Sequence, residues 1–212
     1  MKPLCLLLFL WLMPLRAEIV DRIAAVVGDR VIPRSAALAE ARYQAFLSGQ
    51  EPPPEDLDQA SLEKIVSQLA DQILLEQARA ISPFAPSESE ETYRRLEEIR
   101  KRFPSPQAYQ NALARYRLTE SEVRQRLSRE IDLLAFIDFR LRPQVRLDPS
   151  QVESYYRETL LPELRRQGQR QEPPLAEVQG RIEEILAQRE MNRLLEEWLK
   201  DLHSRTKVKT FH

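Results

Sequence analysis

The spacing of apolar residues changes along this chain, and each change predicts a different kind of element. Two β-branched runs, at 19–27 and 30–32, flank the pair Gly28-Asp29, which is typical of a β-hairpin with a two-residue turn. Near the other end, residues 206–211 follow a period of two, as in a short strand. A hairpin and a lone strand are each marginal alone, so we expect them to pair.

Between these segments, apolar residues recur every three or four positions, the spacing of amphipathic helices. Predicted helices cover residues 35–49, 58–80, 87–103, 106–116, 119–141, 149–160 and 175–202. Capping residues that mark helix starts are Ser35, Ser105 before Pro106, Thr119 with Glu122, and Asp148 before Pro149. In the helix 119–141, the residues expected on the buried face are Val123, Leu127, Ile131, Leu134, Ile137 and Leu141.

These elements predict the fold class. It is mainly α, a helical module closed by a small β-sheet that pairs the N-terminal hairpin with the C-terminal strand. The composition agrees, because the chain has only 4 Gly but many strong helix formers.

Residues 1–17 have the pattern of a secretory signal peptide. Lys2 is followed by an apolar run at 4–13, then by Pro14 and the small residue Ala17. The run is shorter than the ~20 residues of a membrane-spanning helix, and no later apolar stretch is longer. We therefore expect export without stable membrane insertion. Removal of residues 1–17 also removes Cys5, so the mature chain 18–212 carries no thiol.

The charge balance excludes one class of function. The chain has 32 Lys and Arg residues against 33 Asp and Glu residues, a formal net charge of −1. A nucleic-acid-binding protein needs an excess of cations to neutralise phosphates. We therefore expect no nucleic-acid partner.

Residues with catalytic or ligand-binding chemistry are few. The two histidines, His203 and His212, both lie near the C-terminus, where a lone histidine usually faces solvent or the helix dipole. Gly28 and Gly49 lack the partner glycines of a phosphate-binding loop. Most carboxylates sit at caps or one helical turn from Arg or Lys, a pattern typical of a solvated surface. The sequence predicts no enzyme, no metal site and no cofactor.

Tyrosines in the middle helices are the strongest candidates for contact with another chain. Tyrosine offers a large amphipathic surface at a small cost in side-chain entropy. Burial in the core is the competing interpretation for each of them. The candidate residues are Tyr109, Tyr116, Tyr155 and Tyr156.

The order of these elements resembles that of SurA-like periplasmic chaperones. Residues 23–32 and the capped helix after them resemble the N-terminal region of that family, and residues 69–78 resemble its second helix. Residues 118–124 look like the start of its long helix. Residues 196–199, leading into 207–209, are similar to its closing helix and strand. The resemblance covers nearly the whole mature chain.

One segment departs from the family pattern. Family members commonly carry one or two parvulin-type prolyl isomerase domains between the long helix and the closing helix. Here only 30 residues separate Arg142 from Pro173, and none of them is His or Cys; domains rarely have fewer than ~50 residues. The resemblance thus implies a chaperone module made of 18–147 and 175–212, with a short helical connector, 148–174, in place of the isomerase domain.

The resemblance implies a function in the periplasm. The expected activity is that of a non-catalytic chaperone, a holdase, for unfolded polypeptide clients such as outer-membrane proteins or secreted proteins. Two alternatives stay open. One is a structural or adaptor subunit with a single dedicated partner or a homodimer. The other is a residual peptidyl-prolyl isomerase, for which the sequence offers no acid or base.

Overall fold

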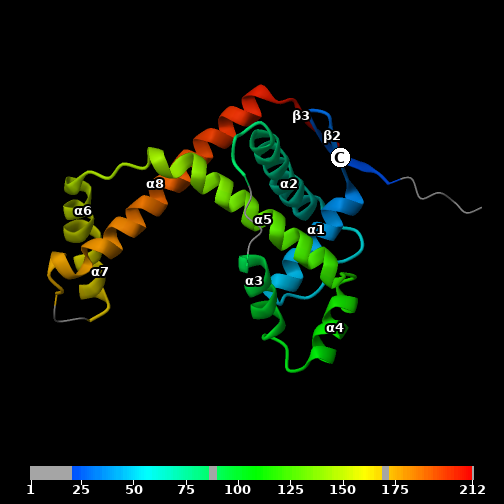
Figure 1. Cartoon of the computed structure of the whole chain (residues 1–212), viewed down its shortest axis with the longest axis horizontal. Coiled ribbons are helices and arrows are strands. Elements are labelled where there is room, and N and C mark those ends of the chain that lie inside the picture. Colours follow the sequence, from blue (N-terminus) through cyan, green and yellow to red (C-terminus); the bar gives the residue numbers. More distant parts are fainter. Residues whose placement is uncertain (1–20, 86–89, 169–171, 212) are drawn as a thin grey trace, which may run out of the picture.

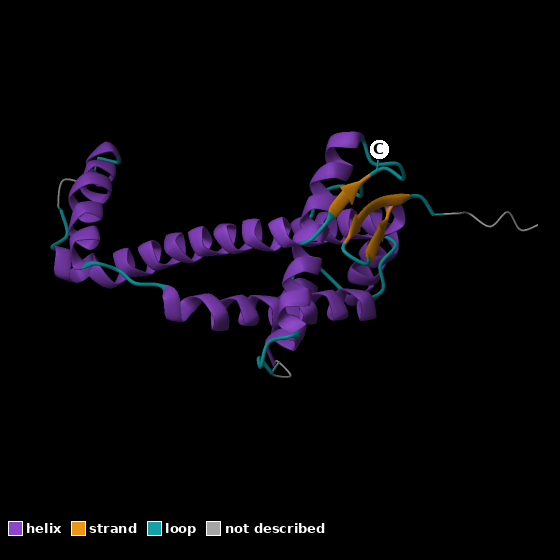
Figure 2. Cartoon of the chain, turned by 90° about the horizontal axis from the view of Figure 1, so that it is seen from above, coloured by secondary structure: helices purple, strands orange, loops and turns teal. Residues whose placement is uncertain are grey.

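The computed structural model describes residues 21–85, 90–168 and 172–211. These residues form a mainly helical chain with a small antiparallel sheet (Figures 1 and 2), which confirms the predicted fold class. The predicted signal peptide, residues 1–17, lies outside the described residues.

The sheet joins the two ends of the described chain. Strands β1 (Ile23–Val27) and β2 (Arg30–Pro33) form the predicted hairpin, and β3 (Val208–Thr210) pairs antiparallel with the other side of β1, giving the order β2-β1-β3. Two backbone bonds flank the β1–β3 pairing: Gly28 N donates to the Lys207 carbonyl at 3.0 Å, and Phe211 N donates to the Ala24 carbonyl at 2.9 Å. The predicted pairing of hairpin and C-terminal strand is confirmed.

Helices make up the rest of the molecule. They are α1 (Arg34–Ser48), α2 (Gln59–Ala80), α3 (Glu90–Arg100), α4 (Pro106–Arg115), α5 (Glu120–Leu141), α6 (Pro149–Tyr155), α7 (Leu161–Arg166) and α8 (Leu175–Arg205). Three of the four predicted caps are confirmed by side-chain bonds to the first turn: Ser105, Thr119 in a capping box with Glu122, and Asp148.

The fourth predicted cap, Ser35, is wrong. Helix α1 begins one residue earlier, at Arg34, and Pro33 occupies the N-cap position without a side-chain bond. Ser35 N instead donates to Asp21 Oδ1 at 3.3 Å, and the Ser35 hydroxyl also bonds the Asp21 carboxylate. The Ser35 amide at this helix start therefore bonds a carboxylate that precedes the hairpin, which sequence spacing does not reveal.

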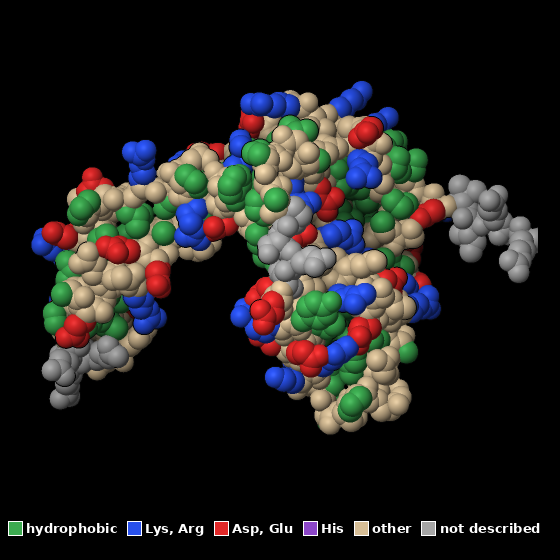
Figure 3. All heavy atoms as spheres, viewed as in Figure 1, with side chains coloured by type: hydrophobic (Ala, Val, Ile, Leu, Met, Phe, Trp, Pro, Cys, Tyr) green, Lys and Arg blue, Asp and Glu red, His purple; other side chains and the backbone are tan. Residues whose placement is uncertain are grey.

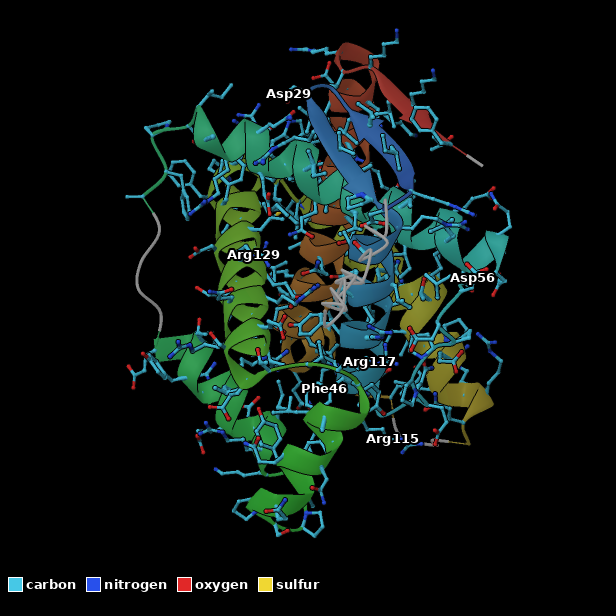
Figure 4. The ribbon with its side chains drawn as sticks, turned by 90° about the vertical axis from the view of Figure 1, so that its right-hand side faces the viewer. Asp29, Phe46, Asp56, Arg115, Arg117 and Arg129 are labelled. Atoms are coloured by element: carbon cyan, nitrogen blue, oxygen red, sulfur yellow. The ribbon has the colours of Figure 1, made fainter. Side chains whose placement is uncertain are left out.

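The core has three parts that follow the path of the chain. In the first, the inner face of the sheet packs on α1 and α2 through residues such as Val27, Ile32 and Leu74. In the second, the end of α1 meets α3, α4 and the start of α5 around Phe46, which Figure 4 shows beside α4. In the third, Leu75 and the end of α5 pack against α8.

A separate lobe, made of α6, α7 and the turn between them, sits on the N-terminal half of α8 (Figures 1 and 2). Residues 156–160 form a π-helical turn just before Pro162. Proline cannot donate a backbone hydrogen bond and crowds the preceding turn, which accounts for the wider turn at this point. The predicted connector 148–174 is thus helical over 149–166.

Gly28 provides a test of the hairpin. Its φ is +60°, in the left-handed region, and an added Cβ would lie 3.5 Å from the Thr206 side chain, an ordinary contact. Gly28→Ala should therefore lower the free energy of unfolding by about 1–2 kcal/mol through backbone strain alone. The matched control is Gly180→Ala, inside α8 with open space around it, which should raise stability by about 0.5–1 kcal/mol. Urea unfolding followed by circular dichroism would measure both, and a neutral Gly28→Ala would contradict the left-handed turn.

Candidate functional site

The molecule has a concave side. The lobe of α3 and α4 lies against the N-terminal half of α5, and the lobe of α6 and α7 lies on the N-terminal half of α8; the space-filling view shows an open hollow between the two lobes (Figures 1 and 3). A second chain could contact several elements at once in a molecule of this shape. The location of exposed apolar side chains decides where it could bind.

Two of the four candidate tyrosines are core residues. Tyr109 and Tyr116 are 3% and 7% exposed, and both rings contact Phe46, with centroids 6.3 and 5.5 Å away. The Tyr116 hydroxyl donates to the backbone carbonyl of Gln50. Burial, followed by the charge of Glu120, raises the pKa of Tyr109. Both side chains are therefore packed in the core, the competing interpretation from the sequence, because α4 turns its apolar face inward onto α1; their role in client contact stays a prediction.

The other two tyrosines are half-buried in the α6–α7 lobe. The Arg189 guanidinium lies over the Tyr155 ring, 4.9 Å from its centroid, and the Tyr156 hydroxyl donates to the Pro173 carbonyl at 2.8 Å. Both side chains therefore link the lobe to α8 or to the segment before it. Their role in client contact stays a prediction.

An apolar groove runs between α2 and α5. It has a volume of about 380 Å³, and its apolar walls are Leu75 from α2 and Leu133, Leu134 and Ile137 from α5. Leu134 is 65% exposed. The polar rim consists of Gln68, Asp71, Gln72 and Glu130. The groove can accept a large apolar side chain between polar edges.

The position of Leu134 corrects a prediction. The sequence places it on the buried face of α5, but the helix changes partner along its length, from α3 to α8. The buried residues accordingly shift from Val123 and Leu127 to Phe136, Ile137 and Leu141. The adjacent pair Leu133-Leu134 was the available signal, because neighbouring helical residues cannot both face one partner.

A second apolar surface lies around the loop that follows α2. Ile81 is 91% exposed, and the Phe84 ring lies 5.5 Å from that of Phe139, which is 52% exposed. The buried Phe136 ring joins this pair to Trp198 of α8, with centroids 5.7 Å apart in each case. The C-terminal half of α5 thus carries exposed apolar side chains on two of its sides.

A polar cavity of about 200 Å³ adjoins the groove, and both share Gln72 and Glu130. Arg126 pairs with Glu40 across it and lies over the Tyr43 ring, 5.2 Å from the centroid. The Tyr43 hydroxyl is buried beside the Glu130 carboxylate but has no partner in hydrogen-bonding geometry. Burial raises the pKa of both Tyr43 and Glu130.

Residues with catalytic potential are tied to structural partners. His203 Nε2 lies 2.6 Å from Asp71 Oδ1, which links the last turn of α8 to α2. Within residues 21–85, 90–168 and 172–211, no three His, Cys, Asp or Glu side chains are placed to bind a metal ion. A histidine held by a carboxylate could serve as a base, but among the described residues no Ser, Thr or Cys side chain bonds to this pair.

The described helices include none that is both long and apolar enough to cross a bilayer. No protein-family model matches this chain, and no curated protein is similar to it at a significant level.

Proposed function

We propose that residues 18–212 form a non-catalytic holdase chaperone of the periplasm, which binds unfolded outer-membrane or secreted polypeptides. The observation that carries this proposal is the open groove between α2 and α5, where Leu134 is exposed next to buried Leu75 and Ile137. A soluble chain that leaves a large aliphatic residue exposed beside an apolar recess has a surface suited to another chain. The SurA-like order of elements supports the same function.

The dimensions of this surface fit weak and varied binding. The groove accepts one or two side chains, and the second apolar surface at Ile81 and Phe139 offers another contact along α5. Short apolar contacts with polar rims hold many different segments without high affinity. A holdase of this kind needs no nucleotide, and release follows from the fast dissociation of weak contacts.

Catalysis is not part of the proposal. Of the 30 residues between Arg142 and Pro173, those that the structure describes form the α6–α7 lobe and its flanking segments, with no separate isomerase domain among them. We propose that the connector replaces the domain that SurA-like proteins commonly carry. The adaptor alternative uses the same groove for one dedicated partner and differs from the holdase only in promiscuity.

The function is tested with the chain from Glu18 onward, the form that export would leave. A urea-unfolded outer-membrane barrel protein is diluted into buffer with increasing amounts of this chain, and light scattering is recorded. We expect aggregation to be suppressed at near-stoichiometric ratios. In a parallel refolding assay limited by proline isomerisation, we expect no acceleration.

Two results would contradict the proposal. Unchanged light scattering at large molar excess would remove the general chaperone and favour the adaptor. Accelerated refolding would show an isomerase activity that the proposal excludes. Bovine serum albumin at equal mass serves as the control for non-specific suppression.

A further inference from the structure

The groove between α2 and α5 is acidic as well as apolar. Its lining includes two carboxylates, Asp71 and Glu130, and no Lys or Arg. Asp71 is engaged by His203. Glu130, in contrast, forms no ion pair with any described residue, although it is more than half-buried. An unpaired, partly buried carboxylate favours the approach of a cation.

The groove rim also carries polar atoms that could bond a peptide backbone. Gln68 uses its side-chain oxygen to accept from Gln44 at 3.0 Å, and Gln72 uses its amide nitrogen to donate to Glu76 at 2.8 Å. Within the described residues, Gln68 Nε2 and Gln72 Oε1 have no protein partner. One donor and one acceptor, a helical turn apart on α2, can bond the carbonyl and amide of an extended backbone.

We propose that the groove between α2 and α5 binds an extended client segment in which a large apolar residue stands beside a lysine or arginine. The apolar side chain enters between Leu75, Leu134 and Ile137, and the cation lies against the Glu130 carboxylate. Glu130 is then the residue that determines client specificity at this site. This inference rests on the proposed chaperone function, and it adds a substrate class to it.

The surroundings of Glu130 disfavour its charged form, which a cation in the groove would stabilise. Burial raises its pKa and the charge of Glu40 raises it further, while the Tyr43 hydroxyl and the charges of Arg126 and Arg129 lower it. Arg126 is already paired with Glu40, and Figure 4 shows Arg129 on α5. Among the described residues, neither arginine forms an ion pair with Glu130, so a cation from the client would be its first ion-pair partner. The titratable and charged groups that face Glu130 or share its cavity and groove are Tyr43, Glu40, Asp71, Glu76, Arg126 and Arg129.

Fluorescein-labelled peptides test this inference by fluorescence anisotropy at low ionic strength. Three peptides share the frame Gly-Ser-Thr-Leu-Xaa-Leu-Thr-Ser-Gly, with Lys, Gln or Glu at the central position. For the unmodified chain from Glu18 onward, we expect the Lys peptide to bind on the order of tenfold tighter than the Glu peptide, the size of one charge-assisted contact. The Gln peptide should lie between them.

Two variants separate the charge from the apolar contact. Glu130→Gln should bring the Lys and Glu peptides to nearly equal affinity and keep the affinity for the Gln peptide. Leu134→Ser should weaken all three peptides by roughly fivefold, because it removes apolar contact area. The matched controls are Glu153→Gln, at the hollow between α6 and α8, and Val31→Ser, an exposed aliphatic on strand β2 of the sheet; both should leave the three affinities unchanged.

Acidification gives an independent readout. As the pH falls through the raised pKa of Glu130, the carboxylate is protonated and the preference for the Lys peptide should disappear. The same titration with Glu130→Gln is the control, because any pH dependence that remains in this variant comes from other groups. A preference that persists unchanged in Glu130→Gln would overturn the role of Glu130.

The remaining outcomes separate this inference from the proposed function. If Leu134→Ser leaves peptide binding unchanged but still suppresses aggregation, the groove is not the client site and the chaperone stands. If Leu134→Ser converts a dimer into a monomer with unchanged peptide binding, the groove holds a second copy and the inference fails. If the unmodified chain neither binds peptide nor suppresses aggregation, the proposed function itself fails. Matching circular dichroism spectra and urea midpoints establish that each variant is folded.

Discussion

Replacing Phe46 with alanine should lower the free energy of unfolding by about 3–5 kcal/mol, the range for a buried phenylalanine. Phe46 is 4% exposed and lies at the centre of a ring cluster, with Phe103, Tyr109 and Tyr116 within 6.3 Å of its centroid. Those rings come from the loop before α4 and from α4 with its C-cap, while Phe46 belongs to α1, so they cannot all move to fill the space that the side chain leaves.

Urea unfolding followed by circular dichroism at 222 nm measures this change. The matched control is Phe139→Ala, the same deletion at a ring that is 52% exposed, for which we expect a loss below about 1 kcal/mol. An unchanged m-value in both variants would show that the unfolded states are comparable. Equal losses at the two positions would contradict the assignment of Phe46 to the centre of the core.

The second large effect is expected at Ile182, which is 1% exposed on α8. Val152 of α6 and Leu161 of α7 are the buried residues of the two helices that form a lobe on α8, as Ile182 is of α8 itself. Ile182→Ala should lower the local free energy of opening of this lobe by about 2–5 kcal/mol. The sheet and the helices α1 to α5 have their own buried clusters, so they should keep their stability.

Hydrogen exchange measured by mass spectrometry tests this local effect. Amides of 149–166 should lose protection in Ile182→Ala, while those of α2 and α5 exchange as before. Ile23→Ala, the same deletion at a side chain that is 47% exposed on β1, should leave the lobe unaffected. A uniform loss of protection over the whole chain would show that the lobe and the body unfold as one unit.

Local patterns in the sequence were sufficient to predict the helices and strands and where most helices begin. Asp58, Ser105, Thr119 and Asp148 cap helices because each side chain bonds an amide two or three residues ahead, and such short-range contacts leave a sequence signature. The Gly28-Asp29 turn is local in the same way. The pairing of β3 with β1 followed from a more general argument, that short strands need neighbours.

The sequence by itself therefore determined a mainly helical chain closed by a small sheet, together with most of the helix caps. Only the tertiary structure decided which apolar residues are available to another chain. Helical periodicity identifies a face but not its partner, so it could not distinguish buried Tyr109 from exposed Leu134. The same limit applies to Glu130, whose unpaired state depends on residues of α1 and α2 that lie 54 or more positions away in the sequence. A groove between two helices is made by their crossing, and no periodicity within either helix records it.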